Sequence, residues 1–68
     1  MNEEALNMSL RKFLKVVGVS SQREIENAVA KASADGSLAG QSKLPATMTL
    51  AIAGLKLNVK FDGEIDLG

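Results

Sequence analysis

Three acidic side chains near the end of the chain, Asp62, Glu64 and Asp66, are the closest grouping of residues that could do chemistry. Carboxylate oxygens bind calcium, but these three lack the ligand number and the spacing of an EF-hand loop. Asp62 and Gly63 are more simply explained as turn residues. The chain contains no histidine and no cysteine, which removes the usual general base, the thiolate nucleophile and the commonest metal ligands. We therefore expect no catalytic residue, no cofactor and no metal site, and we expect that the protein is not an enzyme.

A second candidate is the segment Gly18-Val19-Ser20, which is similar to the turn of a DNA-binding helix-turn-helix. In that interpretation, the helix after the turn would present four residues to bases or phosphates: Ser21, Gln22, Arg23 and Asn27. However, Ile25 falls one position later than the usual spacing, and phosphates would repel Glu24 and Glu26. We therefore favour a structural corner between two helices, with DNA binding as the alternative.

A third candidate is a basic patch formed by Arg11, Lys12 and Lys15 beside Met8. A basic helical face with an exposed methionine could contact an acidic partner or an anionic lipid surface. The alternative is an ordinary solvated face, which Glu4 partly neutralises. The sequence leaves both interpretations open.

Composition limits the classes of partner. Eight basic residues balance eight acidic ones over 68 residues, so the excess of positive charge that nucleic acid binding needs is absent. No apolar run approaches the ~20 residues that cross a bilayer. The acidic start Met1-Asn2-Glu3-Glu4 and the absence of cysteine indicate a cytoplasmic protein. A domain this small buries only roughly 60% of its unfolded surface, so self-association or a protein partner would help to stabilise it.

Two helices are predicted in the first half of the chain, at about residues 3–17 and 22–35. The first has Asn2 as its N-cap, Gly18 as its stop and a stripe of large apolar residues: Leu6, Leu10, Phe13, Leu14 and Val17. The second begins with a capping box from Ser21 to Glu24 and ends at Gly36. Its stripe consists mostly of smaller residues: Ile25, Ala28, Val29 and Ala32.

A β-hairpin is predicted in the second half from the alternation of apolar and polar residues. A two-residue turn at Ala53-Gly54 makes all the pairs on one face apolar: Ile52–Leu55, Leu50–Leu57, Met48–Val59 and Ala46–Phe61. The pairs on the other face are mostly polar: Ala51–Lys56, Thr49–Asn58 and Thr47–Lys60. Because a one-residue slip would mix the two faces, the pattern predicts a sheet with one side that must be covered.

The turn residues Asp62 and Gly63 predict a third strand at about 64–67, and residues 36–45 are expected to form a linker. The predicted fold is therefore α+β, with two N-terminal helices packed on one face of a three-stranded antiparallel meander. We expect a single domain over residues 1–68, with strands at about 46–52, 55–61 and 64–67.

The first strand forms one edge of this sheet, and the run Thr47–Ala53 has no charge. Uncharged edges pair readily with other chains, although Pro45 blocks one end of this one. The edge is either a seam between two copies or a strand that the linker shields.

Four segments resemble a family of short, functionally uncharacterised bacterial proteins: Arg11–Leu14, Gly18–Glu26, Lys43–Pro45 and Asp62–Ile65. The resemblance extends from Asn2 to Gly63, and it implies a free-standing small cytoplasmic protein without an assigned activity or site. Together with the residue patterns, it leads us to expect a non-catalytic protein-interaction or structural module that associates with another protein or with itself.

Overall fold

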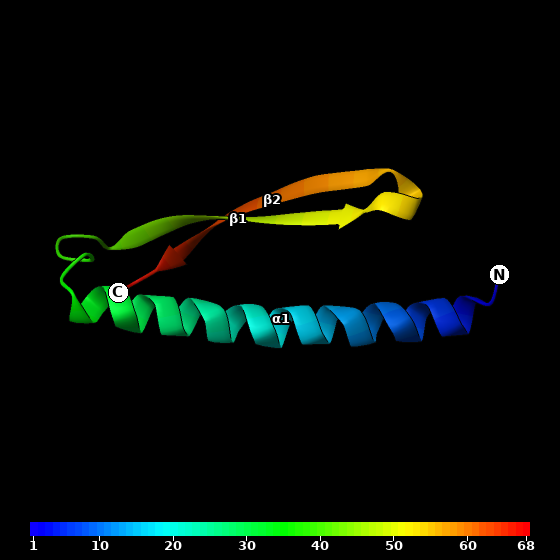
Figure 1. The fold of residues 1–68 in the computed structure, drawn as a ribbon, viewed down its shortest axis with the longest axis horizontal. Helices are drawn as coiled ribbons and strands as arrows, with labels where there is room; N and C mark the ends of the chain where they lie inside the picture. The colour runs from blue at the N-terminus through cyan, green and yellow to red at the C-terminus, as the bar shows by residue number, and fades with distance from the viewer. The chain divides into compact units, whose positions relative to one another are not determined.

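The computed structural model describes residues 1–68, which fall into two units, Met1–Leu38 and Ala39–Gly68 (Figure 1). The first unit contains one helix, α1 (Glu3–Ala34). The second is a hairpin of β1 (Lys43–Ile52) and β2 (Leu57–Asp66), joined by a short 3₁₀ turn, η1 (Ala53–Leu55). The α+β class is right, but the prediction of two helices and a three-stranded meander is wrong.

Both ends of α1 have the hydrogen bonds that helix ends require. The side chain of Asn2 accepts a hydrogen bond of 3.1 Å from the amide of Ala5, which confirms the predicted N-cap. At the other end, the amide of Ser37 donates to the carbonyl of Ala32 over 3.0 Å, around a left-handed Gly36 with φ +82°. This Schellman arrangement satisfies free carbonyls of the last turn, so the predicted end at Gly36 is also confirmed.

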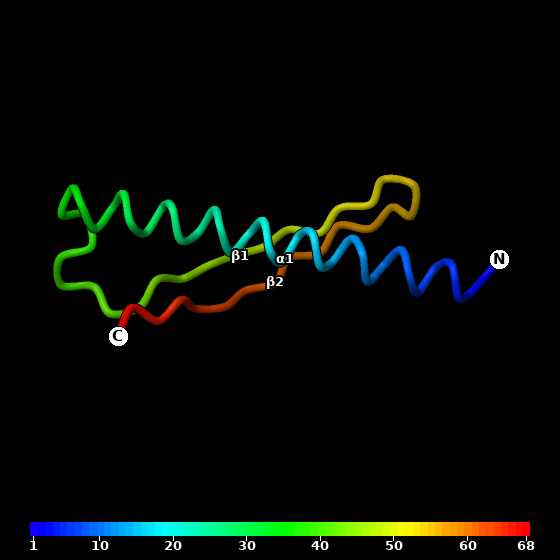
Figure 2. The backbone as a smooth tube through the Cα atoms, turned by 90° about the horizontal axis from the view of Figure 1, so that it is seen from below, coloured from blue at the N-terminus to red at the C-terminus, as the bar shows by residue number.

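The predicted stop at Gly18 and the predicted corner after it are wrong, because α1 continues through both without a break (Figures 1 and 2). The two predicted stripes are already in phase, because Val17 at the end of the first and Ile25 at the start of the second are eight positions apart, with the polar Ser21 midway between them. A continuous helix keeps all of them on one face. A glycine inside a helix costs only about 1 kcal/mol relative to alanine, so one Gly18 does not interrupt it.

The hairpin has the predicted faces but not the predicted register. Leu50 lies opposite Val59, where the prediction placed it opposite Leu57. The loop contains four residues rather than two, and its last residue, Lys56, takes the left-handed conformation with φ 53°. The two-residue difference leaves the side chains of Ala46–Ile52 and Leu57–Phe61 on their predicted faces, because the side-chain period of a strand is two. Leu55 and Lys56, which were predicted in the second strand, lie in the loop.

The predicted second turn and third strand are wrong, because Asp62 and Gly63 lie inside β2. The observed register places Gly63 opposite Ala46 and Ile65 opposite Leu44, so the apolar match continues to the end of the ladder. The end of the predicted linker is wrong for the same reason, since Lys43–Pro45 belong to β1.

Neither unit contains a hydrophobic core. No side chain of the chain is buried, although 46% of its residues are apolar. The largest apolar residues remain well exposed, including Phe13 at 53% and Phe61 at 57%. Two-stranded hairpins are at best marginally stable in water, and most helix stability in proteins comes from packing of an apolar face. Both units therefore present apolar faces that are not buried.

We predict that Gly18→Ala stabilises the protein by about 0.5–1 kcal/mol, because alanine is the better residue inside a helix. A Cβ atom at this position would meet no atom within 4 Å. Chemical denaturation at a fixed protein concentration measures the change. The matched control is Gly36→Ala, which also has free space but lies at φ +82° and should destabilise the protein. Destabilisation by Gly18→Ala would indicate a break in the helix.

A second prediction concerns Asp35 after the end of α1. The hydroxyl and the backbone amide of Ser37 donate to its carboxylate, which holds the pKa of Asp35 below its ordinary value. A carboxyl group with a lowered pKa in the folded state stabilises above its unfolded pKa, and the contribution disappears as pH falls through the folded pKa. Ser37→Ala should therefore raise the pKa of Asp35 in an NMR titration. An unchanged pKa would contradict the capping geometry.

Candidate interaction surface

The hairpin has one apolar face, which we call the hairpin apolar face. It consists of five cross-strand pairs: Leu44–Ile65, Ala46–Gly63, Met48–Phe61, Leu50–Val59 and Ile52–Leu57. Their side chains range from half-buried to exposed, with Met48 at 45%. A face of this kind gains about 25 cal/mol for each Å² that another surface removes from water. The hairpin apolar face is therefore suited to binding an apolar surface.

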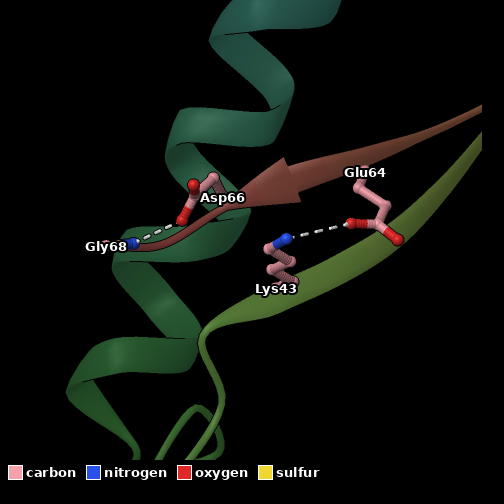
Figure 3. Close-up of polar contacts among 4 residues, drawn as sticks. All are labelled: Lys43, Glu64, Asp66 and Gly68. Atoms are coloured by element: carbon pink, nitrogen blue, oxygen red, sulfur yellow. Dashed lines mark hydrogen bonds and ion pairs between the residues drawn. The ribbon is translucent and has the colours of Figure 1, made fainter.

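The opposite face of the hairpin is polar and partly paired. The Thr47 hydroxyl donates to the Asp62 carboxylate over 2.9 Å, which links the two strands. The ammonium group of Lys43 lies 3.8 Å from the carboxylate of Glu64 (Figure 3). Both side chains of this ion pair are more than 60% exposed, so it contributes little stability.

The three carboxylates that were considered as calcium ligands do not converge on one point. Asp62, Glu64 and Asp66 occupy alternate positions of β2, so about 7 Å of strand separates each from the next. Asp66 accepts a hydrogen bond of 2.9 Å from the amide of Gly68 (Figure 3). The structure contains no group of three or more carboxylate, imidazole or thiol side chains that could hold a metal ion. On this face, the carboxylates act as polar side chains of a strand.

The basic patch lies on α1, and Met8 beside it is 72% exposed. An open hollow of about 440 Å³ is lined by four residues of the same helix: Glu4, Asn7, Met8 and Arg11. Their spacing places all four on one side of the helix. No stretch of α1 is long and apolar enough to cross a membrane. The patch offers charge and one apolar contact, without side chains grouped for catalysis.

The residues of the helix-turn-helix alternative, Ser21, Gln22, Arg23 and Asn27, all lie in the second half of α1. A recognition helix must be set at an angle to the helix before it, and that angle requires a turn. Because α1 is continuous through Gly18, the structure has no such turn. The structure therefore gives no support for DNA binding through a helix-turn-helix.

The outer edge of β1 has a defined hydrogen-bonding pattern. The amide of Leu67 donates to the carbonyl of Ser42 over 2.7 Å, and the register makes these two residues directly opposite. Hydrogen-bonded pairs alternate along an antiparallel ladder, so the even-numbered residues of β1 bond to β2. The backbone groups of the odd-numbered residues point outward: Lys43, Pro45, Thr47, Thr49 and Ala51.

Pro45 agrees with this assignment, because a proline has no N–H and is tolerated in a strand where that group would face away from the sheet. The uncharged edge could be predicted from the sequence, but which of its backbone groups are free could not. The sequence did contain a clue to these groups. Pro45 is an odd-numbered residue, and a proline is tolerated where its nitrogen faces away from the sheet, so the odd-numbered positions face outward. The register of the hairpin was needed to use it.

Comparison with known proteins establishes the family. The chain belongs to a family of unknown function (DUF6494), whose model matches residues 1–68. The predicted resemblance to a functionally uncharacterised family is therefore confirmed. No curated protein and no solved structure matches the chain.

We predict close approach of the α-hydrogens of Thr49 and Lys60, and of Thr47 and Asp62. These are the pairs without mutual hydrogen bonds, in which the two backbones come nearest. Nuclear Overhauser effects between the α-hydrogens test the assignment. Cross-peaks between Thr49 and Asn58 would instead support the two-residue turn and reject the observed register.

Proposed function

We propose that this protein is a small, non-catalytic interaction module that associates with a second copy of itself through apolar surface. The observation that carries the proposal is the absence of any buried side chain in a chain of ordinary apolar content. Fully burying a large apolar side chain is worth roughly 1.5–3 kcal/mol, and conformational entropy opposes folding at every residue. A chain of two uncovered amphipathic units gains stability when another chain covers them.

The exposure of α1 supports the same conclusion. Met8, Val16 and Val19 lie on the side of the helix away from the apolar stripe, and each is more than half exposed. The stripe residues Phe13 and Leu14 are also more than half exposed. The first half of the helix therefore has apolar residues on two sides, and one hairpin face can cover only one side of a helix.

Charge is compatible with self-association. The formal net charge is zero, so two copies do not repel each other through their net charge. The absence of histidine and cysteine supports a role without catalysis, because it removes the usual general base and the thiolate nucleophile. The lack of cysteine favours a reducing compartment such as the cytoplasm as the place where the protein works. DNA binding is not proposed, because no observation favours it.

The native mass in solution tests the proposal. Light scattering across a concentration series should show a mass that rises from 7.1 kDa toward twice that value. The melting temperature should rise with concentration as well, because association stabilises the folded state. A constant mass of 7.1 kDa at every concentration, with an unchanged melting temperature, would contradict self-association.

Met48→Ser should weaken the association, because Met48 is a large side chain of the hairpin apolar face and is 45% exposed. The expected loss is roughly tenfold or more in the dissociation constant, since burial of one large apolar side chain exceeds the free energy of a tenfold change. The matched control is Thr49→Ser, which changes the neighbouring residue on the polar face and keeps its N–H. Equal effects of the two variants would place the contact elsewhere.

A further inference from the structure

We infer that the second copy binds along the outer edge of β1, so that two hairpins form one four-stranded antiparallel sheet. The order of strands in this sheet is β2, β1, the partner's β1 and the partner's β2. This inference rests on the proposed self-association and adds its place and its register. It starts from the two-stranded sheet, in which each strand has one free edge.

Charge distinguishes the two edges. Natural sheets protect a free edge with charged side chains, which prevent pairing with other chains. β2 has that protection on its polar face, with Lys60, Asp62, Glu64 and Asp66 at alternate positions. β1 has no charged residue after Lys43, and the uncharged run continues through the turn to Leu55. The unprotected edge is therefore the edge of β1.

Backbone hydrogen bonds select one register. Thr47, Thr49 and Ala51 each direct an N–H and a C=O outward, whereas Pro45 has no N–H to offer. Antiparallel pairing about a two-fold axis at Thr49 places Thr49 opposite the partner's Thr49 and Thr47 opposite the partner's Ala51. All the outward groups of these residues then form hydrogen bonds with the partner. Pro45 falls opposite the partner's Ala53, which lies beyond the end of the strand.

The side chains agree with the same register. Because the pairing joins odd-numbered residues to odd-numbered residues, both hairpin apolar faces lie on the same side of the new sheet. Ala46 lies opposite the partner's Ile52, and Met48 lies opposite the partner's Leu50. A small residue thus faces a large one, and two flexible apolar residues face each other. Moving the axis by one residue toward Pro45 would bring that proline into the ladder opposite the partner's Ala51.

A second copy fits this edge because, in the antiparallel arrangement, the N–H groups of each edge lie opposite the C=O groups of the other. The pairing needs no charged partner, and the only groups it must satisfy are three N–H and three C=O groups per chain. It also raises the sheet from two strands to four, and sheets with three or more strands and an apolar face are the ones that reach independent stability. The pairing thus supplies the strands that the two-stranded hairpin lacks, and it places the two hairpin apolar faces side by side as one larger apolar face.

Disulfide trapping tests the register, since the chain has no cysteine of its own. Directly opposite residues with mutual hydrogen bonds have Cα atoms about 5.5 Å apart, within the range that a disulfide spans. Thr49→Cys should therefore form a covalent dimer on mild oxidation at low protein concentration. Thr47→Cys alone should not, because the two copies of this residue lie four positions apart along the strand, about 13 Å. A mixture of Thr47→Cys and Ala51→Cys should form the mixed disulfide.

Proline substitution provides a second measurement. Thr49→Pro removes the outward N–H at the axis from both copies, and Pro45 shows that a proline at an outward position is compatible with the hairpin. The dissociation constant should rise by at least roughly thirtyfold, the change expected for two lost hydrogen bonds. Circular dichroism at high concentration checks that the hairpin is retained. Thr49→Val is the control and should leave the dissociation constant within about threefold of its original value, since it keeps the N–H.

The outcomes separate this inference from the proposed function. A dimer by light scattering in which Thr49→Cys fails to crosslink would overturn the edge pairing and leave self-association intact. Equal crosslinking of Thr49→Cys and Thr47→Cys would indicate random collision and would also overturn the register. A mass that stays at 7.1 kDa at every concentration would overturn both.

Discussion

The physical constraint on this chain is that two amphipathic units share 68 residues and neither has a buried interior. In an ordinary domain, apolar faces of helices and sheets are buried against each other, and that burial offsets the conformational entropy lost on folding. Here the helix is well capped and the hairpin is regular, so local structure is strongly specified. Local hydrogen bonds alone contribute little net free energy, because water satisfies the same groups in the unfolded chain. The exposed apolar faces therefore limit the stability of the protein, and they are the basis of the proposed self-association.

The faces of the hairpin could be predicted from sequence, whereas its register could not. Leu50 and Met48 were assigned to the apolar side, and they lie there, because alternation has a period of two and survives any even shift. The register depends on the turn, and the turn depends on one residue. Lys56 adopts a left-handed conformation that glycine or asparagine usually takes, so the sequence signal pointed to Gly54 instead. The third strand had another origin: the predicted first strand began only at Ala46, and the residue types of Asp62 and Gly63 are typical of a turn, whereas β1 in fact begins at Lys43.

In the helix, the local sequence pattern was misleading and the longer-range pattern of apolar residues was correct. Gly18, Ser21 and Glu24 form a good local pattern for a stop followed by a new start, and each of these residues occurs at real helix ends. A glycine inside a helix costs only about 1 kcal/mol, whereas a break at Gly18 would leave the backbone groups of two further helix ends without intrahelical partners. In the continuous 32-residue helix, the apolar residues on both sides of Gly18 share a face. Val17 and Ile25 keep the same phase across the glycine, because eight positions are close to two full turns plus one residue of the 3.6-residue period. Local capping residues indicate where a helix can end, and only the longer pattern indicates whether it does.

In the proposed dimer, the difference between the two strand edges also explains why association would stop at two copies. Pairing of β1 with β1 about a two-fold axis consumes the uncharged edge of both chains and leaves β2 outermost on each side. The outermost strands then carry Lys60, Asp62 and Glu64, which oppose the addition of another strand. Pairing of β1 with β2 of another copy would leave one free β1 edge at every step and would extend without limit. An edge that would be an aggregation hazard in isolation thus becomes part of a closed assembly, because its neighbour in the same hairpin is charged.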